Sequence, residues 1–297
     1  MSRTFVFFHS LAFAFALFSS ISAIQFPDSI QTDRSQLAPS HFMGDHKIQA
    51  YRYKHNRKRP KQASTTPLKK LCDQWDKYGG PDDSGASGYM IYNNLWGMNY
   101  GQGRQCTYLW SINRHGVRWS SEWTWYDGPY NVKSYANVQK IFKPMYIGQV
   151  GTIETQWTWS YETPRGDAVA NVAYDMMTAL YSNGRKYEIM VWLAQIGQAG
   201  PISTSGEEPE TVFIHNVQFY LYHGRPPGLN TYSFVPVEKT WLRNFKGDLA
   251  EFLFHLVWAG KLPTDALLET IGAGSEPFVG TDAKFTTEFI SIDIEPK

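Results

Sequence analysis

From residue 71 onward, the chain is a series of short stretches in which apolar and polar residues alternate, separated by Gly, Pro, Asn and Asp. Successive side chains of a β-strand point to opposite faces, so this alternation predicts strands. Two stretches place large residues on one face: Trp119, Ser121, Trp123 and Trp125, then Thr155, Trp157 and Trp159. Further strands are expected at 89–94, 169–176, 212–222, 231–235, 267–271 and 285–294. Many short strands with regular turns predict an all-β sandwich or barrel.

One segment has helical periodicity instead. Its apolar residues recur at spacings of three and four positions: Leu249, Phe252, Leu253, Leu256 and Val257. Asp248 and Glu251 suit the N-terminus of a helix, and Gly260 followed by Pro263 suits its end. We expect a single helix, packed on the outside of the β-sandwich.

The stretch 186–194 is the most informative of the expected strands. One face carries Ile189, Val191 and Leu193, which is an ordinary core stripe, and the other carries Glu188, Met190 and Trp192. A carboxylate, a thioether and an indole side by side suit the floor of a sugar-binding cleft, where Trp stacks on a sugar ring and Glu does acid-base or nucleophilic work. The alternative is a half-buried strand with one exposed glutamate.

The N-terminal part of the chain has a different character. Residues 1–23 combine an early Arg3 with an apolar run and small residues, which predicts a secretory signal peptide and a secreted protein. No segment is a good membrane span. Residues 24–70 are basic and poor in large apolar residues, so we expect them to be disordered. The remaining residues, 71–297, are then expected to form one large all-β domain, the catalytic domain.

Several interpretations of the basic segment compete. It could be a pro-segment, a surface-adhesion tail, a nucleic-acid patch or a plain linker, and a plain linker is favoured. The signal peptide argues against nucleic acid, and the net charge of +1 says little about partners. Lys69 and Lys70 directly before Leu71 suit a dibasic processing protease.

Composition adds two constraints. Aromatic residues make up 16% of the chain, with 11 Trp, which suits either a thick β core or a carbohydrate-stacking surface. The only cysteines, Cys72 and Cys106, predict one disulfide in a secreted protein. Two cysteines without metal-ligand spacing make a metal site or a cofactor unexpected.

A second carboxylate, Glu276, lies in the glycine-rich stretch 272–280. Glycines let the backbone bend and approach a ligand closely, and Pro277 stiffens the exit from the turn. Glu276 can therefore be aimed at a ligand. The alternative is a solvent-exposed loop carboxylate.

Motifs along nearly the whole folded part resemble glycoside hydrolase family 12, a family of secreted endo-β-1,4-glucanases. Each motif is weak alone, but their common order and spacing make the match strong. They are Cys72-Asp73-Gln74-Trp75, Tyr92-Asn93-Asn94-Leu95-Trp96-Gly97, Cys106, Trp123-Thr124-Trp125, Asn131-Val132-Lys133-Ser134-Tyr135, Asn171-Val172-Ala173-Tyr174-Asp175, Tyr187-Glu188-Ile189-Met190-Val191-Trp192-Leu193, Gly200-Pro201-Ile202 and Ser275-Glu276-Pro277-Phe278.

The resemblance implies a β-jelly roll of two curved antiparallel sheets, the concave one forming an open cleft for a glucan chain. It implies retaining hydrolysis with Glu188 as nucleophile, Glu276 as general acid/base and Asp175 beside the nucleophile. Cys72 and Cys106 match the family's disulfide pair. A retaining enzyme needs two carboxyl groups about 5–5.5 Å apart. Repulsion between them raises one pKa, and Asp175 close to Glu188 could hold or share a proton, so a mildly acidic optimum is expected.

The resemblance also suggests substrate-binding residues. Trp75 and Trp96 are expected to stack on sugar rings and Asn94 to bind hydroxyls. Trp125 and Trp192 are further candidates, although aromatic residues are commonly buried in sandwiches. Met190 packs under the sugar or simply fills a gap.

The stretch 194–203 is more similar to the Ala-rich version of xyloglucan-specific members than to that of plain cellulases. A small residue at Ala199 could leave room for xylosyl branches. The expected partner is thus a polysaccharide, xyloglucan or a related β-glucan, acted on by a monomer. A broader endo-β-1,4-glucanase is the runner-up, and a non-hydrolytic glucan-binding or decoy paralogue is the alternative from another class.

Overall fold

The computed structural model describes residues 66–80, 85, 87–204 and 209–297. The expected signal peptide at 1–23 and most of the basic segment 24–70 lie outside these residues. Within the described residues the chain forms strands, two short 3₁₀ helices (η1, Met98–Tyr100; η2, Ile147–Gln149) and one α-helix, α1, Ala250–Trp258. None of the helices found there is both long and apolar enough to pass through a bilayer.

The first sheet, sheet A, is antiparallel throughout. Its strand order is β1 (Lys69–Leu71), β4 (Gln102–Asn113), β5 (Gly116–Tyr126), β16 (Pro277–Pro296), β8 (Val150–Glu162) and β14 (Asn244–Asp248). Lys69 and Lys70, assigned from the sequence to the preceding segment, pair here with Leu109 and Tyr108. The dibasic pair therefore lies in an edge strand of the folded domain.

The second sheet, sheet B, carries most of the expected site residues. Its strand order is β2 (Lys77–Tyr78), β3 (Tyr89–Tyr92), β6 (Ala136–Lys140), β15 (Leu267–Ser275), β9 (Val169–Leu180), β10 (Arg185–Ile196), β13 (Leu229–Pro236), β12 (Val217–Gly224) and β11 (Glu210–Ile214), with β7 (Met145–Tyr146) also on β15. The pair β10–β13 is parallel, an exception to the expected antiparallel arrangement.

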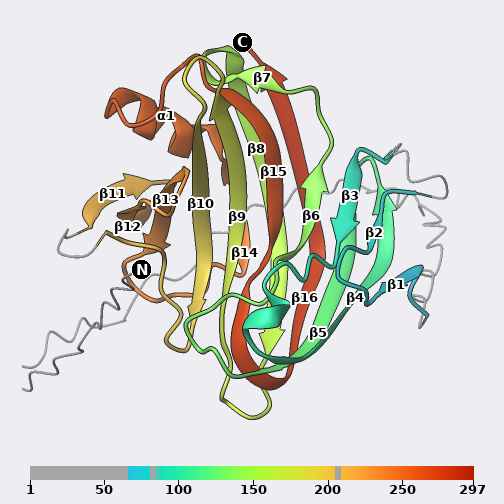
Figure 1. The fold of residues 1–297 in the computed structure, drawn as a ribbon. Coiled ribbons are helices and arrows are strands. Elements are labelled where there is room, and N and C mark those ends of the chain that lie inside the picture. Colours follow the sequence, from blue (N-terminus) through green and yellow to red (C-terminus); the bar gives the residue numbers. More distant parts are fainter. Residues whose placement is uncertain (1–65, 81–84, 86, 205–208) are drawn as a thin grey trace, which may run out of the picture. The chain divides into compact units, whose positions relative to one another are not determined.

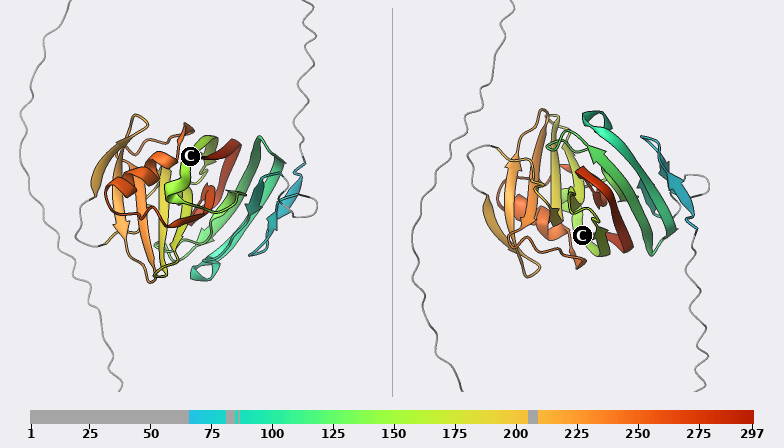
Figure 2. Two further views of the ribbon diagram at one scale, coloured as in Figure 1. Left: turned by 90° about the horizontal axis from the view of Figure 1, so that it is seen from above. Right: turned by 90° about the horizontal axis from the view of Figure 1, so that it is seen from below.

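The two sheets are curved and face each other, as Figures 1 and 2 show. The start of β16 pairs with β9 of sheet B, and the rest of it pairs with β5 and β8 of sheet A, so this strand joins the two layers. The fold prediction of a β-jelly-roll sandwich with one packed helix is confirmed.

The core lies between the sheets and is rich in aromatic rings. Trp119 and Trp157 are both fully buried and contact Phe285 edge-on, with ring centroids 5.3 and 6.1 Å away. Both Trp stripes expected from the alternation are on the core side. Burying each such side chain stabilises the fold by roughly 1.5–3 kcal/mol.

Helix α1 begins and ends close to the expected residues. The Asp248 carboxylate accepts hydrogen bonds from the backbone N–H groups of Ala250 (2.8 Å) and Ile153 (2.7 Å), although Leu249 is the capping position. Gly260, with φ of 67°, follows the last turn. Phe252 packs against Phe219 and Phe234 of sheet B, at 5.4 and 5.0 Å. The apolar face of the helix therefore packs onto the main core, as its periodicity predicted, while Glu251 and Trp258 are exposed.

Candidate active site

Strand β10 separates core side chains from site side chains, as the alternation predicted. Ile189, Val191 and Leu193 belong to the main core between the sheets. Met190 and Trp192 belong to a second, smaller apolar cluster on the other face of sheet B, with Ala173, Ala199, Val235 and Phe278. We call this face the outer face of sheet B. Glu188 shares it by strand parity.

Glu188 is held by the parallel neighbour of its strand. It lies opposite Thr231 of β13, whose hydroxyl donates a 2.7 Å hydrogen bond to Glu188 Oε2. Burial raises the pKa of Glu188 above its ordinary value, and the Thr231 hydrogen bond opposes that rise. Thr231 thus stabilises the ionised form of this carboxyl group.

Asp175 lies next to Glu188 on the adjacent strand. In the antiparallel β9–β10 register it is opposite Met190, so Glu188 is its diagonal neighbour on the same face. Burial raises the pKa of Asp175 well above its usual range, and the charges of Glu188 and Glu276 raise it further. Its Oδ1 atom is buried and has no hydrogen-bond partner among the described residues. These effects favour the protonated form of Asp175.

Glu276 is aimed from the junction of β15 and β16. The side chain of Asn171, on β9, holds Glu276 with two hydrogen bonds. Its amide N–H donates to Glu276 Oε2 at 2.6 Å, and its Oδ1 accepts from the Glu276 backbone N–H at 3.0 Å. Burial and the charge of Glu188 raise the pKa of Glu276 to about 8, while the Asn171 hydrogen bond opposes the rise. This carboxyl group is protonated at mildly acidic pH.

A buried chain of hydrogen bonds supports Asn171 from sheet A. Trp123 Nε1 donates to the Tyr161 hydroxyl at 2.9 Å, and this hydroxyl is 3.1 Å from Ser275 Oγ. Ser275 in turn donates to the backbone carbonyl of Asn171 at 2.6 Å. The orientation of Glu276 therefore rests on groups from both sheets.

Tyr135 places a neutral hydroxyl beside the acidic cluster. Its hydroxyl donates to the Ala173 carbonyl at 3.0 Å. Burial raises its pKa well above 10, and the charges of Asp175, Glu276 and Glu188 add to the rise. All three carboxyl groups are thus electrostatically coupled to this one ring.

Trp75 and Trp96 are exposed near one another, as expected for stacking platforms. Their exposed fractions are 65% and 45%. The residues just before them, Gln74 and Leu95, are joined by two hydrogen bonds: Leu95 N–H donates to Gln74 O at 2.9 Å, and Gln74 Nε2 donates to Leu95 O at 3.2 Å.

The loops that carry these two tryptophans are tied to the rest of the site. The predicted disulfide Cys72–Cys106 is present, with Cα atoms 4.3 Å apart, and it anchors the Trp75 loop to β4. Asn94, with φ of 48°, accepts the Tyr135 backbone N–H at 3.0 Å through its carbonyl. The Trp96 loop is therefore linked directly to the Tyr135 segment.

The other two tryptophans proposed to contact the sugar, Trp125 and Trp192, are buried. Trp125 is 1% exposed in the core between the sheets, and its Nε1 donates to Gln105 Oε1 at 3.5 Å. Its selection was wrong, because its strand face points inward and its ring cannot reach a ligand. Trp192 is on the outer face as expected but is 2% exposed, and Met190 is 6% exposed. Both side chains therefore lie beneath the outer face, and the Trp192 ring offers no open surface for stacking.

Lys133 joins three segments of the site. It is fully buried, and its ammonium group donates to the backbone carbonyls of Gly128, Asn131 and Phe278 at 2.8, 2.7 and 2.8 Å. Its backbone N–H donates to Pro277 O, and its carbonyl accepts from Gly97 N–H. Lys133 therefore ties the loop after Trp96, through its backbone carbonyl, to the strand after Glu276, through its backbone N–H and its ammonium group.

Four residues of this site were not selected from the sequence: Asn171, Thr231, Tyr135 and Lys133. Asn171 shares a face with Asp175 by strand alternation, and Lys133 and Tyr135 lie in a family motif, so a signal existed for these three. Thr231 had none, because the parallel pairing of β10 and β13 cannot be read from local pattern. Among the described residues, no group of three or more His, Cys, Asp or Glu side chains is arranged to hold a metal ion.

Comparison with known proteins shows which family this chain resembles in sequence and fold. The model of glycosyl hydrolase family 12 matches residues 87–295. The probable xyloglucan-specific endo-β-1,4-glucanase A of Aspergillus clavatus is 40% identical over 235 residues, covering 78% of this chain and 94% of that protein. The xyloglucan-specific endo-β-1,4-glucanase 1 of Phytophthora nicotianae is 40% identical over 223 residues, covering 74% and 89%.

Solved structures agree. The crystal structure of Trichoderma harzianum endoglucanase 3, from the same family, superposes with a TM-score of 0.69 at 30% identity, covering 79% of this chain and all of that one. A Bacillus licheniformis family 12 xyloglucanase, at 20% identity and a TM-score of 0.62, shares the fold. The chain is therefore a member of glycosyl hydrolase family 12.

Proposed function

We propose that the protein is a secreted, retaining endo-β-1,4-glucanase that cleaves the backbone of xyloglucan in plant cell walls. The observation that carries this proposal is the difference between two coupled carboxyl groups. Burial raises the pKa of both, but at Glu188 the Thr231 hydroxyl opposes that rise, whereas at Glu276 the charge of Glu188 adds to it and brings the pKa to about 8. A nucleophile has to be ionised and a general acid protonated, and this difference favours that assignment.

In the first step, the Glu188 carboxylate attacks the anomeric carbon and forms a glycosyl ester as the glycosidic C–O bond breaks. Glu276 donates its proton to the departing oxygen, so the released chain leaves as an alcohol. In the second step, the ionised Glu276 takes a proton from water, whose oxygen displaces Glu188. Two inversions return the original configuration at the anomeric carbon.

Asp175 and Tyr135 set the charge of the site. A protonated Asp175 beside Glu188 adds no further negative charge, so Glu188 can remain ionised next to it. Tyr135 stays neutral because burial, and after it the charges of the neighbouring carboxyl groups, raise its pKa, and it contributes a fixed hydroxyl. In the proposed mechanism the negative charge of the site before catalysis lies on the nucleophile, Glu188.

The substrate assignment rests on the relatives and on the exposed tryptophans. The relatives from Aspergillus clavatus and Phytophthora nicotianae are named for xyloglucan, and Trp75 and Trp96 offer exposed rings for sugar stacking. Ala199 does not contribute in the expected way, because it is 1% exposed and packs into the cluster beneath the outer face. A broader endo-β-1,4-glucanase is the second candidate, favoured by the match to the Trichoderma harzianum endoglucanase.

Reducing-end release from tamarind xyloglucan, barley β-glucan and carboxymethylcellulose, measured in parallel, tests the proposal. We expect release from xyloglucan alone, and none from the Glu188→Gln variant. Comparable release from all three substrates would assign the broader activity. No release from any of them by a folded protein would contradict hydrolysis and favour a glucan-binding role.

A further inference from the structure

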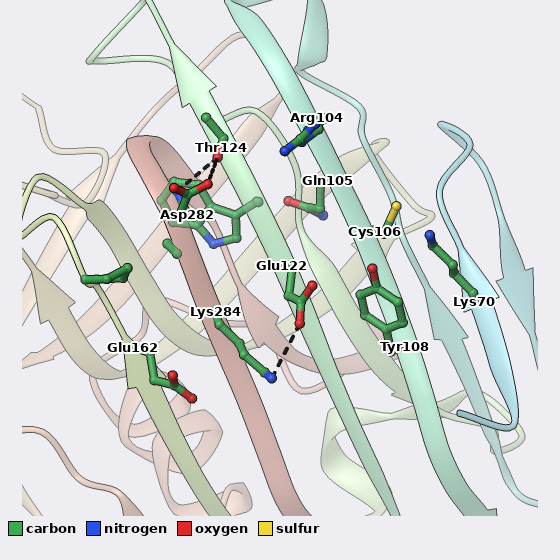
Figure 3. Close-up of a pocket in the computed structure, with 13 residues that line it drawn as sticks. Lys70, Arg104, Gln105, Cys106, Tyr108, Glu122, Thr124, Glu162, Asp282 and Lys284 are labelled. Atoms are coloured by element: carbon green, nitrogen blue, oxygen red, sulfur yellow. Dashed lines mark hydrogen bonds and ion pairs between the residues drawn. The ribbon is translucent and has the colours of Figure 1, made fainter. Parts of the chain in front are cut away.

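Two surface hollows lie away from the acidic cluster, and they differ in charge. The first lies on sheet A and is drawn in Figure 3. Its three cations are balanced by three carboxylates: Lys70, Arg104 and Lys284 against Glu122, Glu162 and Asp282. Lys284 pairs with Glu122 at 3.4 Å, and Lys70 lies over the Tyr108 ring at 5.5 Å. Its cations and carboxylates therefore balance one another in number, and Lys284 and Glu122 are paired directly.

The second hollow has cations without that balance. It has a volume of about 670 Å³ and includes Arg185, Arg225 and Lys261 in its lining, and none of the described residues that line it is Asp or Glu. Lys261 pairs with Glu210 outside the lining at 3.0 Å. Among the described residues, neither Arg185 nor Arg225 has a carboxylate within ion-pair distance. We call this hollow the basic pocket.

The remaining lining supplies groups that suit a sugar. Tyr187 of β10 and Tyr232 of β13 form part of the wall, each 5% exposed, and Asn230 lies beside them. Tyr232 is held flat against His223, with ring centroids 4.4 Å apart and an interplanar angle of 9°. The Tyr hydroxyls and the Asn amide can exchange hydrogen bonds with hydroxyl groups.

The basic pocket is separate from the catalytic residues although it uses the same strands. Tyr187 and Asn230 are the sequence neighbours of Glu188 and Thr231, so their side chains point to the opposite face of sheet B. The segment after α1, with Gly260 and Lys261, closes the other side of the pocket. A ligand there does not compete with the glucan chain.

From these observations we propose that the basic pocket binds an acidic oligosaccharide, a chain that carries uronate carboxylates. Arginine guanidinium groups bind planar carboxylates through paired hydrogen bonds, and the polar wall suits the sugar hydroxyls. The volume exceeds that of a single small anion, since one water occupies about 30 Å³ in the liquid. Such a site would hold the enzyme on acidic polysaccharide while the opposite face of sheet B hydrolyses a neutral one.

Isothermal titration of the full chain with a galacturonate pentamer tests the proposal, beside cellopentaose and inorganic phosphate. We expect binding of the galacturonate pentamer alone, weakened at least about tenfold in Arg185→Gln/Arg225→Gln. Binding should also weaken as salt rises from 20 to about 200 mM. Hydrolysis of a neutral glucan by this variant should be unchanged.

The matched control removes two cations from the charge-balanced hollow. Arg104→Gln/Lys284→Gln makes the same change in net charge, and we expect it to leave galacturonate binding intact. An equal loss in this control would show non-specific attraction and overturn the proposal. Equal binding of phosphate, equal binding of cellopentaose, or no binding of galacturonate would each overturn it too.

Discussion

Asn171 and Glu276 hold each other through two side-chain contacts, one to the Glu276 carboxyl group and one to its backbone N–H. The residues are 105 positions apart in sequence. This pairing fixes the direction of the carboxyl group and tempers its raised pKa. The acid/base chemistry proposed here depends on both effects.

The variant Asn171→Ala removes this support. We expect kcat to fall by about tenfold or more with little change in KM, since a hydrogen bond to a charged group is worth roughly 1.5–3 kcal/mol. Because the Asn171 contact lowers the pKa of Glu276, its loss should move the basic limb of the pH–rate profile to higher pH. An unchanged profile and unchanged kcat would show that Asn171 is structural only.

Thr231→Val should act on the other limb of the profile. The hydroxyl lowers the pKa of Glu188, so its loss should raise that pKa and move the acidic limb to higher pH. Activity near pH 5 should fall more than activity near pH 7. A uniform loss across pH, with a lowered Tm, would instead indicate a packing defect.

Glu276→Gln should stabilise the protein at alkaline pH while abolishing hydrolysis. The folded-state pKa of about 8 is above the ordinary 4.5, so the folded protein binds this proton more tightly than the unfolded chain does. The stability that the Glu276 proton contributes to the fold is therefore fully present below about pH 4.5 and is lost as pH rises through 8. We expect a Tm gain of a few degrees at pH 8.5 and almost none at pH 4.5, measured by calorimetry. The reverse ordering would contradict a raised pKa.

Tryptophan substitutions separate exposed from buried rings. Trp75→Ala and Trp96→Ala should each raise KM for the glucan by about tenfold with a smaller effect on kcat, because a stacking surface is lost. Trp125→Phe should lower Tm by a few degrees and leave KM unchanged, because Trp125 packs in the core. A raised KM in Trp125→Phe would restore it as a ligand contact.

Lys133→Met tests the buried cation. Three backbone carbonyls lose their donor, so we expect a loss of roughly 2–4 kcal/mol in the free energy of unfolding. Lys284→Met is the matched control, since its ion pair with Glu122 is about one-third to one-half exposed and contributes little. Equal Tm values for the two variants would show that Lys133 is dispensable.

Local pattern was sufficient for the strand faces. Alternation alone assigned Glu188 and Ile189 to opposite faces of their strand, and it identified the residues that face the core between the sheets. It could not separate Trp125 from Trp75, because burial depends on which face of which sheet is covered. Nor could it find Thr231, since a parallel pairing between strands distant in sequence is a property of the whole fold. The burial of Lys133 is hidden for the same reason: its three acceptors come from a loop and from β16.

Trapping the covalent intermediate identifies the nucleophile by experiment. A 2-deoxy-2-fluoro glycoside of a cello- or xylogluco-oligosaccharide slows both steps, so the glycosyl-enzyme ester can be digested and located by mass spectrometry. We predict one glycosyl group per protein, attached to the peptide that contains Glu188, and faster labelling in wild type than in Glu276→Gln. A label on Asp175 or Glu276, or turnover with inversion and no ester at all, would contradict the assignment of Glu188 as nucleophile.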